Sequence, residues 1–214
     1  KRNFLNTIPF ETIPDSYDIF FLQIASSWGQ AWSKKQWQNF KTWYKNKPVE
    51  ATSVLPKEVK NWPESSWLKY YISYLVSTEK FFVYPNKSLT TNFGDSGTNN
   101  LDKNAEYQVP LFYIGNYNFI DIDKSLNVYD VYFEILPSKL KSIAPSLKDF
   151  DFSIDLYGKK DMNKISSKFL LSSKEYSSSP IKSFGLEFKP LILNILHESQ
   201  GKIFHFGKKH QFKN

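Results

Sequence analysis

All six tryptophans of this 214-residue chain lie between residues 28 and 67. After residue 105 the sequence changes to short apolar runs separated by turn-forming residues, a pattern typical of β-structure. A change of this kind marks a boundary between parts of a chain that are built differently. We therefore predict two units, an aromatic-rich unit at residues 1–105 and a β-rich unit at residues 106–214.

The first unit begins with a predicted strand and helix. Residues 18–25 (DIFFLQIA) form a short apolar run, which indicates a buried strand. Ser33 is a typical N-cap residue, and Trp37, Phe40 and Tyr44 follow at the spacing of one helix face. We predict a helix from Ser33 to about Tyr44.

A second helix and a second strand complete this unit. Proline suits the first turn of a helix, so we predict that this helix starts near Pro63 and ends at about Thr78. Residues 81–85 (FFVYP) predict a strand, and residues 88–100 predict a polar loop with two glycines.

The second unit alternates apolar runs with turns and shows no helical period. Such a pattern favours an all-β sandwich or barrel. Residues 138–150 are the exception, because they indicate a helical or looped insertion. The predicted strands are LFYI (111–114), NFIDI (118–122), VYDVYFEIL (128–136), FDFSIDLY (150–157), KFLLSS (168–173), SFGLEF (183–188), LILNIL (191–196) and KIFHF (202–206).

The composition excludes several classes of protein. The chain has no cysteine, which excludes disulfides and thiolate metal sites. Its net charge is +7, but Arg2 is the single arginine and no basic block is interleaved with aromatic residues, so we expect no nucleic-acid partner. No apolar run reaches the roughly 18 residues of a membrane span. Because the first residue is Lys1, we expect a piece of a longer chain.

Two aromatic or glycine-rich segments are candidates for ligand binding. Trp28 and Trp32 could form a flat platform for a sugar ring, or they could pack in the core against the helix that follows. Residues 92–99 (NFGDSGTN) contain two glycines that permit positive φ and a close approach to a ligand, or they could form a surface turn.

The chain contains no clear catalytic constellation. Asp121 and Asp123 form an Asp-X-Asp pair that could hold a divalent metal, although a solvated strand end is the favoured interpretation. His197, His205 and His210 lie near the C-terminus, with no fourth metal ligand evident. The catalytic residues are therefore left unassigned.

Three segments carry a family resemblance. Residues 26–32 (SSWGQAW), followed by Trp37, resemble the SSWGWATW…W stretch of bacterial glycosyltransferases of family two. Residues 84–89 (YPNKSL) and 92–98 (NFGDSGT) resemble the YPxxSLxxNIGxDGSGxH segment of that family, in the same order and at a similar spacing. Residues 63–67 (PESSW) resemble its SWDxxW helix start.

Two positions depart from the family pattern. Leu68 stands at the acidic position of SWDxxW, and Asn99 stands where the glycine loop often ends in histidine. No catalytic base is carried over to either position.

The resemblance implies an α+β fold class, in which this chain is the acceptor-side, C-terminal part of a GT-A glycosyltransferase, with helices and short strands, followed by a β-sandwich-like domain. It implies transfer of a sugar from a nucleotide sugar to a glycan acceptor, with a divalent metal (Mn or Mg) in the full-length enzyme. The region that binds the nucleotide and the metal would precede residue 26. We therefore expect no cofactor and no activity in this chain alone. A cytoplasmic location, with peripheral association at the inner face of the membrane, is also implied.

The residues that the resemblance assigns to substrate binding are Trp28, Gly29, Trp32, Asn92, Gly94, Asp95, Ser96, Gly97 and Thr98. A second hypothesis, a non-catalytic carbohydrate-binding or assembly module, is motivated by the β-rich second unit and the surplus of aromatic residues. A third is a structural scaffold domain.

Overall fold

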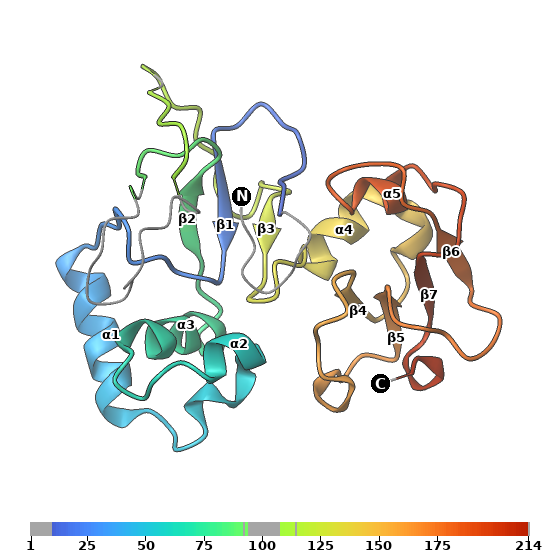
Figure 1. Cartoon of the computed structure of the whole chain (residues 1–214), viewed down its shortest axis with the longest axis horizontal. Coiled ribbons are helices and arrows are strands. Elements are labelled where there is room, and N and C mark those ends of the chain that lie inside the picture. The colour runs from blue at the N-terminus through green and yellow to red at the C-terminus, as the bar shows by residue number, and fades with distance from the viewer. Residues whose placement is uncertain (1–9, 92, 94–107, 114, 214) are drawn as a thin grey trace.

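The computed structural model describes residues 10–91, 93, 108–113 and 115–213. These residues form two lobes that lie side by side, each built around one small sheet (Figure 1). The N-terminal lobe has the strand order β2-β1-β3, with β1 (Ile19–Leu22), β2 (Phe82–Pro85) and β3 (Val128–Tyr129). The C-terminal lobe has the order β4-β5-β7-β6, with β4 (Phe152–Asp155), β5 (Phe169–Ser172), β6 (Lys182–Phe184) and β7 (Phe204–Lys208). The predicted α+β class is confirmed.

Strand β1 is the centre of the first sheet and is buried on both faces. It pairs antiparallel with β2, placing Phe21 opposite Val83, and parallel with β3. Phe20 and Leu22 join the main hydrophobic core, whereas Ile19 and Phe21 belong to a smaller cluster. A strand that is covered on both faces needs apolar side chains on each face, which accounts for the apolar run within residues 18–25. The predicted strand is confirmed.

Three helices pack beside the first sheet (Figure 1): α1 (Lys34–Asn46), α2 (Lys57–Lys60) and α3 (Trp67–Ser77). Ser33 caps α1 through a capping box with Gln36, in which each side chain bonds the other residue's backbone N–H. The buried face of α1 centres on Phe40, whose ring lies 5.1 Å from that of Tyr71 in α3. The first predicted helix is confirmed.

Helix α3 begins at Trp67 and not near Pro63. The Ser66 hydroxyl caps the helix by accepting from the Lys69 backbone N–H, and the Ser66 N–H donates to the Pro63 carbonyl. Residues 63–66 therefore form a turn before the helix. The capping Ser66, and not Pro63, sets where the helix begins.

The C-terminal lobe combines its sheet with α4 (Pro137–Ile143) and α5 (Leu193–Leu196). Strands β4 and β5 are parallel, whereas β7 is antiparallel to both β5 and β6. Helix α4 occupies the predicted insertion at residues 138–150. The β7 residue Phe206 is fully buried and packs edge-on to Phe150 and Phe152.

The run LILNIL (191–196) is helical, so its prediction as a strand was wrong. Leu191, Ile192 and Ile195 share the buried face of this turn. The buried Asn194 side chain accepts from two backbone N–H groups of the preceding loop and donates to two carbonyls, which fixes the turn. Periodicity alone does not separate short buried helices from short buried strands.

The run VYDVYFEIL (128–136) is also not one strand. After β3, the Asp130 carboxylate accepts from the backbone N–H groups of Tyr132 and Glu134, and Phe133 has a φ of +63°. The chain therefore reverses, and the Leu136 N–H returns to the Val128 carbonyl. A side chain that bonds its own backbone in this way competes with strand pairing.

Residues 111–113 and 118–122 form no strand either. Asn118 instead bonds to Asp18, just before β1, through both its backbone N–H and its carbonyl.

One hydrophobic cluster extends through both lobes, from Phe20 in β1 to Phe206 in β7. Strand β3 lies beyond residue 105 and belongs to the first sheet. The division of the chain at residue 105 stays a prediction. Residues on the two sides of this position pack in one core and pair in one sheet. No helix in the described part of the chain is long and apolar enough to cross a bilayer.

Candidate functional site

Three tryptophans present about half of their side chains to solvent. The exposed fractions are 48% for Trp28, 44% for Trp37 and 42% for Trp67. Trp32 lies between the latter two and packs closely on Tyr71, with ring centroids 4.1 Å apart. The Trp32 indole N–H donates to the Gln30 side chain. Trp28 is thus about half exposed, whereas Trp32 mainly packs against the helices.

The two segments that carried the resemblance meet at Gly29. This glycine has a φ of +63°, and a Cβ atom there would collide with the methyl group of Thr90. Thr90 lies between the YPNKSL segment and the glycine loop. The neighbouring Thr91 hydroxyl accepts from the Val109 backbone N–H. Six predicted site residues, Asn92, Gly94, Asp95, Ser96, Gly97 and Thr98, lie outside the described residues.

A groove of about 350 Å³ opens between α1, α3 and the start of β2. We name it the α1–α3 groove. Its described lining combines aromatic and aliphatic side chains with amides and one pair of opposite charges, a mixture typical of small-molecule sites. The lining residues are Phe21, Gln36, Asn39, Tyr71, Tyr74, Leu75, Glu79, Lys80, Phe81, Val83 and Ile122.

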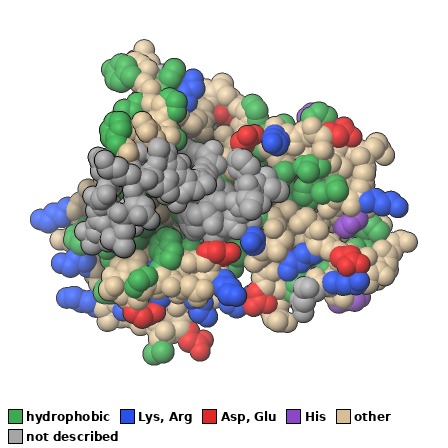
Figure 2. Space-filling model, viewed as in Figure 1, with side chains coloured by type: hydrophobic (Ala, Val, Ile, Leu, Met, Phe, Trp, Pro, Cys, Tyr) green, Lys and Arg blue, Asp and Glu red, His purple; other side chains and the backbone are tan. Residues whose placement is uncertain are grey.

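Lysines are frequent near the groove, since α1 carries Lys34, Lys35, Lys41 and Lys45 and no acidic residue. On the face seen in Figure 2, Lys and Arg side chains are scattered, with Asp and Glu between several of them.

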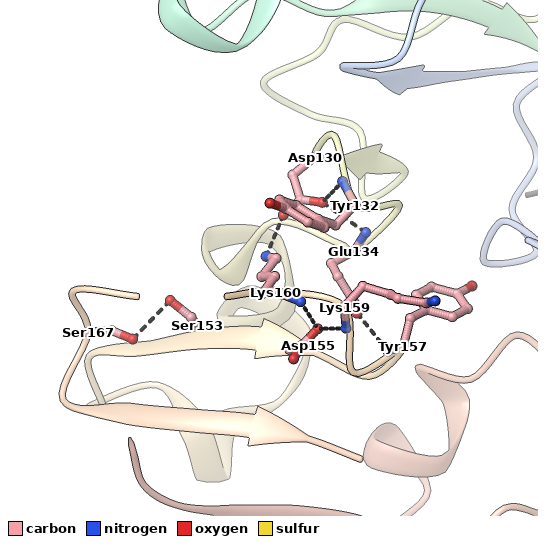
Figure 3. Close-up of polar contacts among 9 residues, drawn as sticks. All are labelled: Asp130, Tyr132, Glu134, Ser153, Asp155, Tyr157, Lys159, Lys160 and Ser167. Carbon is pink, nitrogen blue, oxygen red and sulfur yellow. Dashed lines mark hydrogen bonds and ion pairs between the residues drawn. The ribbon is translucent and has the colours of Figure 1, made fainter. Parts of the chain in front are cut away.

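A second arrangement of charged groups lies between the lobes (Figure 3). The Lys160 ammonium forms an ion pair with Asp130 in the turn after β3. Asp155, at the end of β4, accepts from the backbone N–H groups of Lys159 and Lys160 at 2.7 and 3.0 Å. Glu134 accepts from the Tyr157 N–H at 2.9 Å. We name Asp130, Glu134, Asp155 and Lys160 the interlobe cluster.

Burial changes the proton affinities within the interlobe cluster. Burial raises the pKa of Glu134 well above its ordinary value, with nearby Lys160 opposing the shift, and burial also raises the pKa of Asp155. Burial lowers the pKa of Lys160, but the attraction of Asp130 and Glu134 outweighs this and leaves its pKa raised.

A small cavity adjoins the interlobe cluster. The adjoining cavity, lined in part by Glu134 and Tyr157, measures about 20 Å³, and about 10–15 Å³ already accommodates one water molecule. The cluster therefore joins the turn after β3 to the C-terminal lobe. Sequence reasoning missed it, although Asp130, Glu134 and Asp155 each interrupt an apolar run, a signal that could have identified them.

The described residues do not form a metal centre. No group of three His, Asp or Glu side chains suited to a metal occurs among them. Asp121 and Asp123 have exposed side chains, and their backbone carbonyls accept from Lys124 and Lys139 respectively. His205 instead contacts the Ser183 hydroxyl at 3.0 Å.

Comparison with known proteins identifies no relative: no family model, curated protein or solved structure matches this chain.

Proposed function

We propose that this chain is the acceptor-side part of a glycosyltransferase, which transfers a sugar from a nucleotide sugar to a glycan. The observation that carries this proposal is the contact of Gly29 with Thr90. It brings residues 26–32 next to the residues that link YPNKSL to the glycine loop, about sixty residues further along the sequence, and both stretches resemble glycosyltransferases of family two. The positive φ of Gly29 lets the backbone approach Thr90 in a way that a side chain would prevent.

In this proposal Trp28 is the stacking platform for the acceptor. Its half-exposed indole can cover the apolar face of a sugar ring, and it directly precedes the glycine that contacts Thr90. Gly29 would supply backbone that faces the glycan, and Trp32 would support the platform.

The remaining features of a whole enzyme belong to the same proposal. A GT-A fold would be completed by a nucleotide-binding region preceding residue 26, which would also hold Mn or Mg. The sheet β4-β5-β7-β6 would supply one layer of a sandwich-like accessory domain. The described residues do not fit a metal, so we derive no metal-dependent step for them. The protein would act at the cytoplasmic face of the membrane.

A non-catalytic carbohydrate-binding or assembly module is the second candidate. The half-exposed Trp37 and Trp67 favour it, because they form an aromatic surface around Trp32 that does not depend on an upstream region.

The test compares this chain with the protein extended by its upstream reading frame. We expect only the extended protein to transfer sugar from nucleotide sugars with manganese. The 214-residue chain should give little heat when titrated with the same donors. Tight donor binding by the short chain that is lost in Asp121→Ala would refute this arrangement.

Two tryptophan variants separate the candidates. Trp28→Ala in the extended protein should lower transfer strongly, whereas Trp67→Ala should have little effect on it. If the short chain alone bound glycans, and Trp37→Ala and Trp67→Ala abolished that binding, the module would be the better description.

A further inference from the structure

The lining of the α1–α3 groove includes two buried tyrosines of α3. Tyr71 and Tyr74 line the groove and are only 8% and 6% exposed. Neither hydroxyl has a hydrogen-bond partner among the described residues. Two side-chain polar atoms of the described residues are fully enclosed and unpaired, one in Tyr117 and one in Asp155. The hydroxyls of Tyr71 and Tyr74 are not among these atoms. The two hydroxyls are therefore unpaired but not fully enclosed.

An unpaired hydroxyl on a buried ring is an unusual arrangement, since buried polar groups normally have partners. Burial raises the pKa of Tyr71 to about 12, so its hydroxyl keeps its proton and can both donate and accept.

Further polar groups converge on the same space. The amide of Asn39 has no hydrogen bond among the described residues. Gln36 uses its oxygen for the helix cap, which leaves its NH₂ group available. Glu79 and Lys80 add one negative and one positive charge, so the lining carries no net charge.

The position of Glu79 is an independent sign of function. It has a φ of +52° and ends α3, while the Lys80 N–H donates to the Leu75 carbonyl and the Glu79 N–H donates to the Val76 carbonyl. This is the Schellman arrangement, in which glycine is the usual residue because other residues are strained there. A strained residue that lines a groove points to a role that offsets the strain.

We propose that the α1–α3 groove binds an uncharged sugar residue, with the hydroxyls of Tyr71 and Tyr74 hydrogen-bonding to the hydroxyls of the sugar. Apolar contact would come from Phe21, Phe81 and Val83, which line the same groove. The volume of about 350 Å³ lies within the range of about 300–1,000 Å³ found for small-molecule sites.

The chemistry of the lining selects this ligand class. A nucleotide or another anion would need an excess of positive groups, but Glu79 offsets Lys80. A purely apolar ligand would leave the hydroxyls of Tyr71 and Tyr74 unpaired, at a cost in affinity. The site contains neither Trp28 nor Thr90, so it goes beyond the proposed function and does not require the chain to be part of a transferase.

The experiment titrates the isotope-labelled chain with a panel of free sugars: glucose, galactose, mannose, N-acetylglucosamine and N-acetylgalactosamine. We expect at least one sugar to shift the side-chain amide signals of Asn39 and Gln36 in the NMR spectrum. Tyr71→Phe and Tyr74→Phe remove only the hydroxyls. Each should weaken binding about two- to tenfold, since each deletes one hydrogen bond to an uncharged ligand. Tyr44→Phe, in the neighbouring helix but outside the groove, should leave the affinity unchanged.

A second variant tests the role of Glu79 separately from folding. Glu79→Gly should raise the thermal midpoint, because it relieves the positive φ, and yet weaken sugar binding. The proposal is overturned if no sugar of the panel shifts these signals. It is also overturned if the double variant Tyr71→Phe/Tyr74→Phe binds as the parent does, or if uridine diphosphate binds the groove and the sugars do not. A transferase assay that fails would leave these outcomes unaffected.

Discussion

At Gly29 a single residue permits the approach of two distant segments. Its backbone lies in the left-handed region, and the Thr90 methyl group occupies the position that a side chain would need. Among the described residues, three others that are not glycine also have positive φ, namely Glu79, Phe133 and Glu198. Glu79 lines the groove and Phe133 lies in the turn that contains Asp130 and Glu134, so two of the three strained residues adjoin the sites described above.

Gly29→Ala should destabilise the chain by about 1–2 kcal/mol, because a residue with a Cβ is strained in the left-handed region. The collision with Thr90 adds to this strain. Urea unfolding followed by tryptophan fluorescence measures the change. Gly115→Ala is the matched control, since a Cβ there meets no atom within 4 Å and should leave the midpoint unchanged. Equal midpoints for the two variants would contradict the close approach.

At the scale of elements, short side chains set where helices begin and where strands end. The capping box of Ser33 and Gln36 starts α1, and the carboxylate of Asp130 ends β3 by bonding two backbone N–H groups. Both effects act over a few residues. In both cases the side chain bonds backbone groups no more than four residues away in the sequence.

Ser33→Ala should cost about 1 kcal/mol of stability, as the loss of an N-cap hydroxyl does in other helices. Ser33 is exposed, so the change should arise from the cap alone and not from packing. Ser27→Ala, an exposed serine in the preceding segment, serves as the control in the same urea unfolding assay. A Ser33→Ala midpoint equal to that of the control would show that the capping box contributes nothing.

At the scale of the whole molecule, the interlobe cluster connects the turn after β3 with the end of β4 (Figure 3). Its three carboxylates share the single ammonium of Lys160. A cluster of this kind is stable only while its charges are paired, because burial removes the water that would otherwise solvate them.

Lys160→Met should destabilise the chain by about 3 kcal/mol, since it leaves buried carboxylates without a counter-charge. Lys159→Met is a close control. Lys159 is exposed and lies 3.7 Å from Glu58, and exposed ion pairs contribute less than about 1 kcal/mol. Urea unfolding should therefore separate two variants at adjacent lysines. Similar losses would mean that the Asp130–Lys160 pair is not important for stability.

The stability of the chain should also depend on pH through Glu134 and Asp155. Both have a raised pKa in the folded state, so the folded chain holds these protons more tightly than the unfolded chain. Their contribution is fully present below the unfolded pKa values and is lost as the pH rises through the folded values.

Glu134→Gln keeps the shape of the side chain and removes its titration. We expect the unfolding free energy of the parent to fall between about pH 5 and about pH 8, and the decrease to be smaller in the variant. Urea unfolding at the two pH values measures both. An equal pH dependence in parent and variant would show that Glu134 does not titrate in this range.

Local signals in the sequence determined much of the secondary structure. The apolar run at 18–25 and the Ser33 cap indicated β1 and α1, because burial on both faces and N-capping depend on neighbouring residues. The same signals misassigned LILNIL, since a short apolar run suits either a helix or a strand.

Only the tertiary structure decided the sites. The α1–α3 groove joins α1 with α3 and β2, and the interlobe cluster joins Asp130 with Lys160, thirty residues apart. The contact of Gly29 with Thr90 likewise spans two segments of unrelated local structure. Such meetings depend on how strands pair and helices pack after the chain has closed. No local pattern carries that information, because the free energy that fixes these contacts comes from burial in a core shared by both lobes.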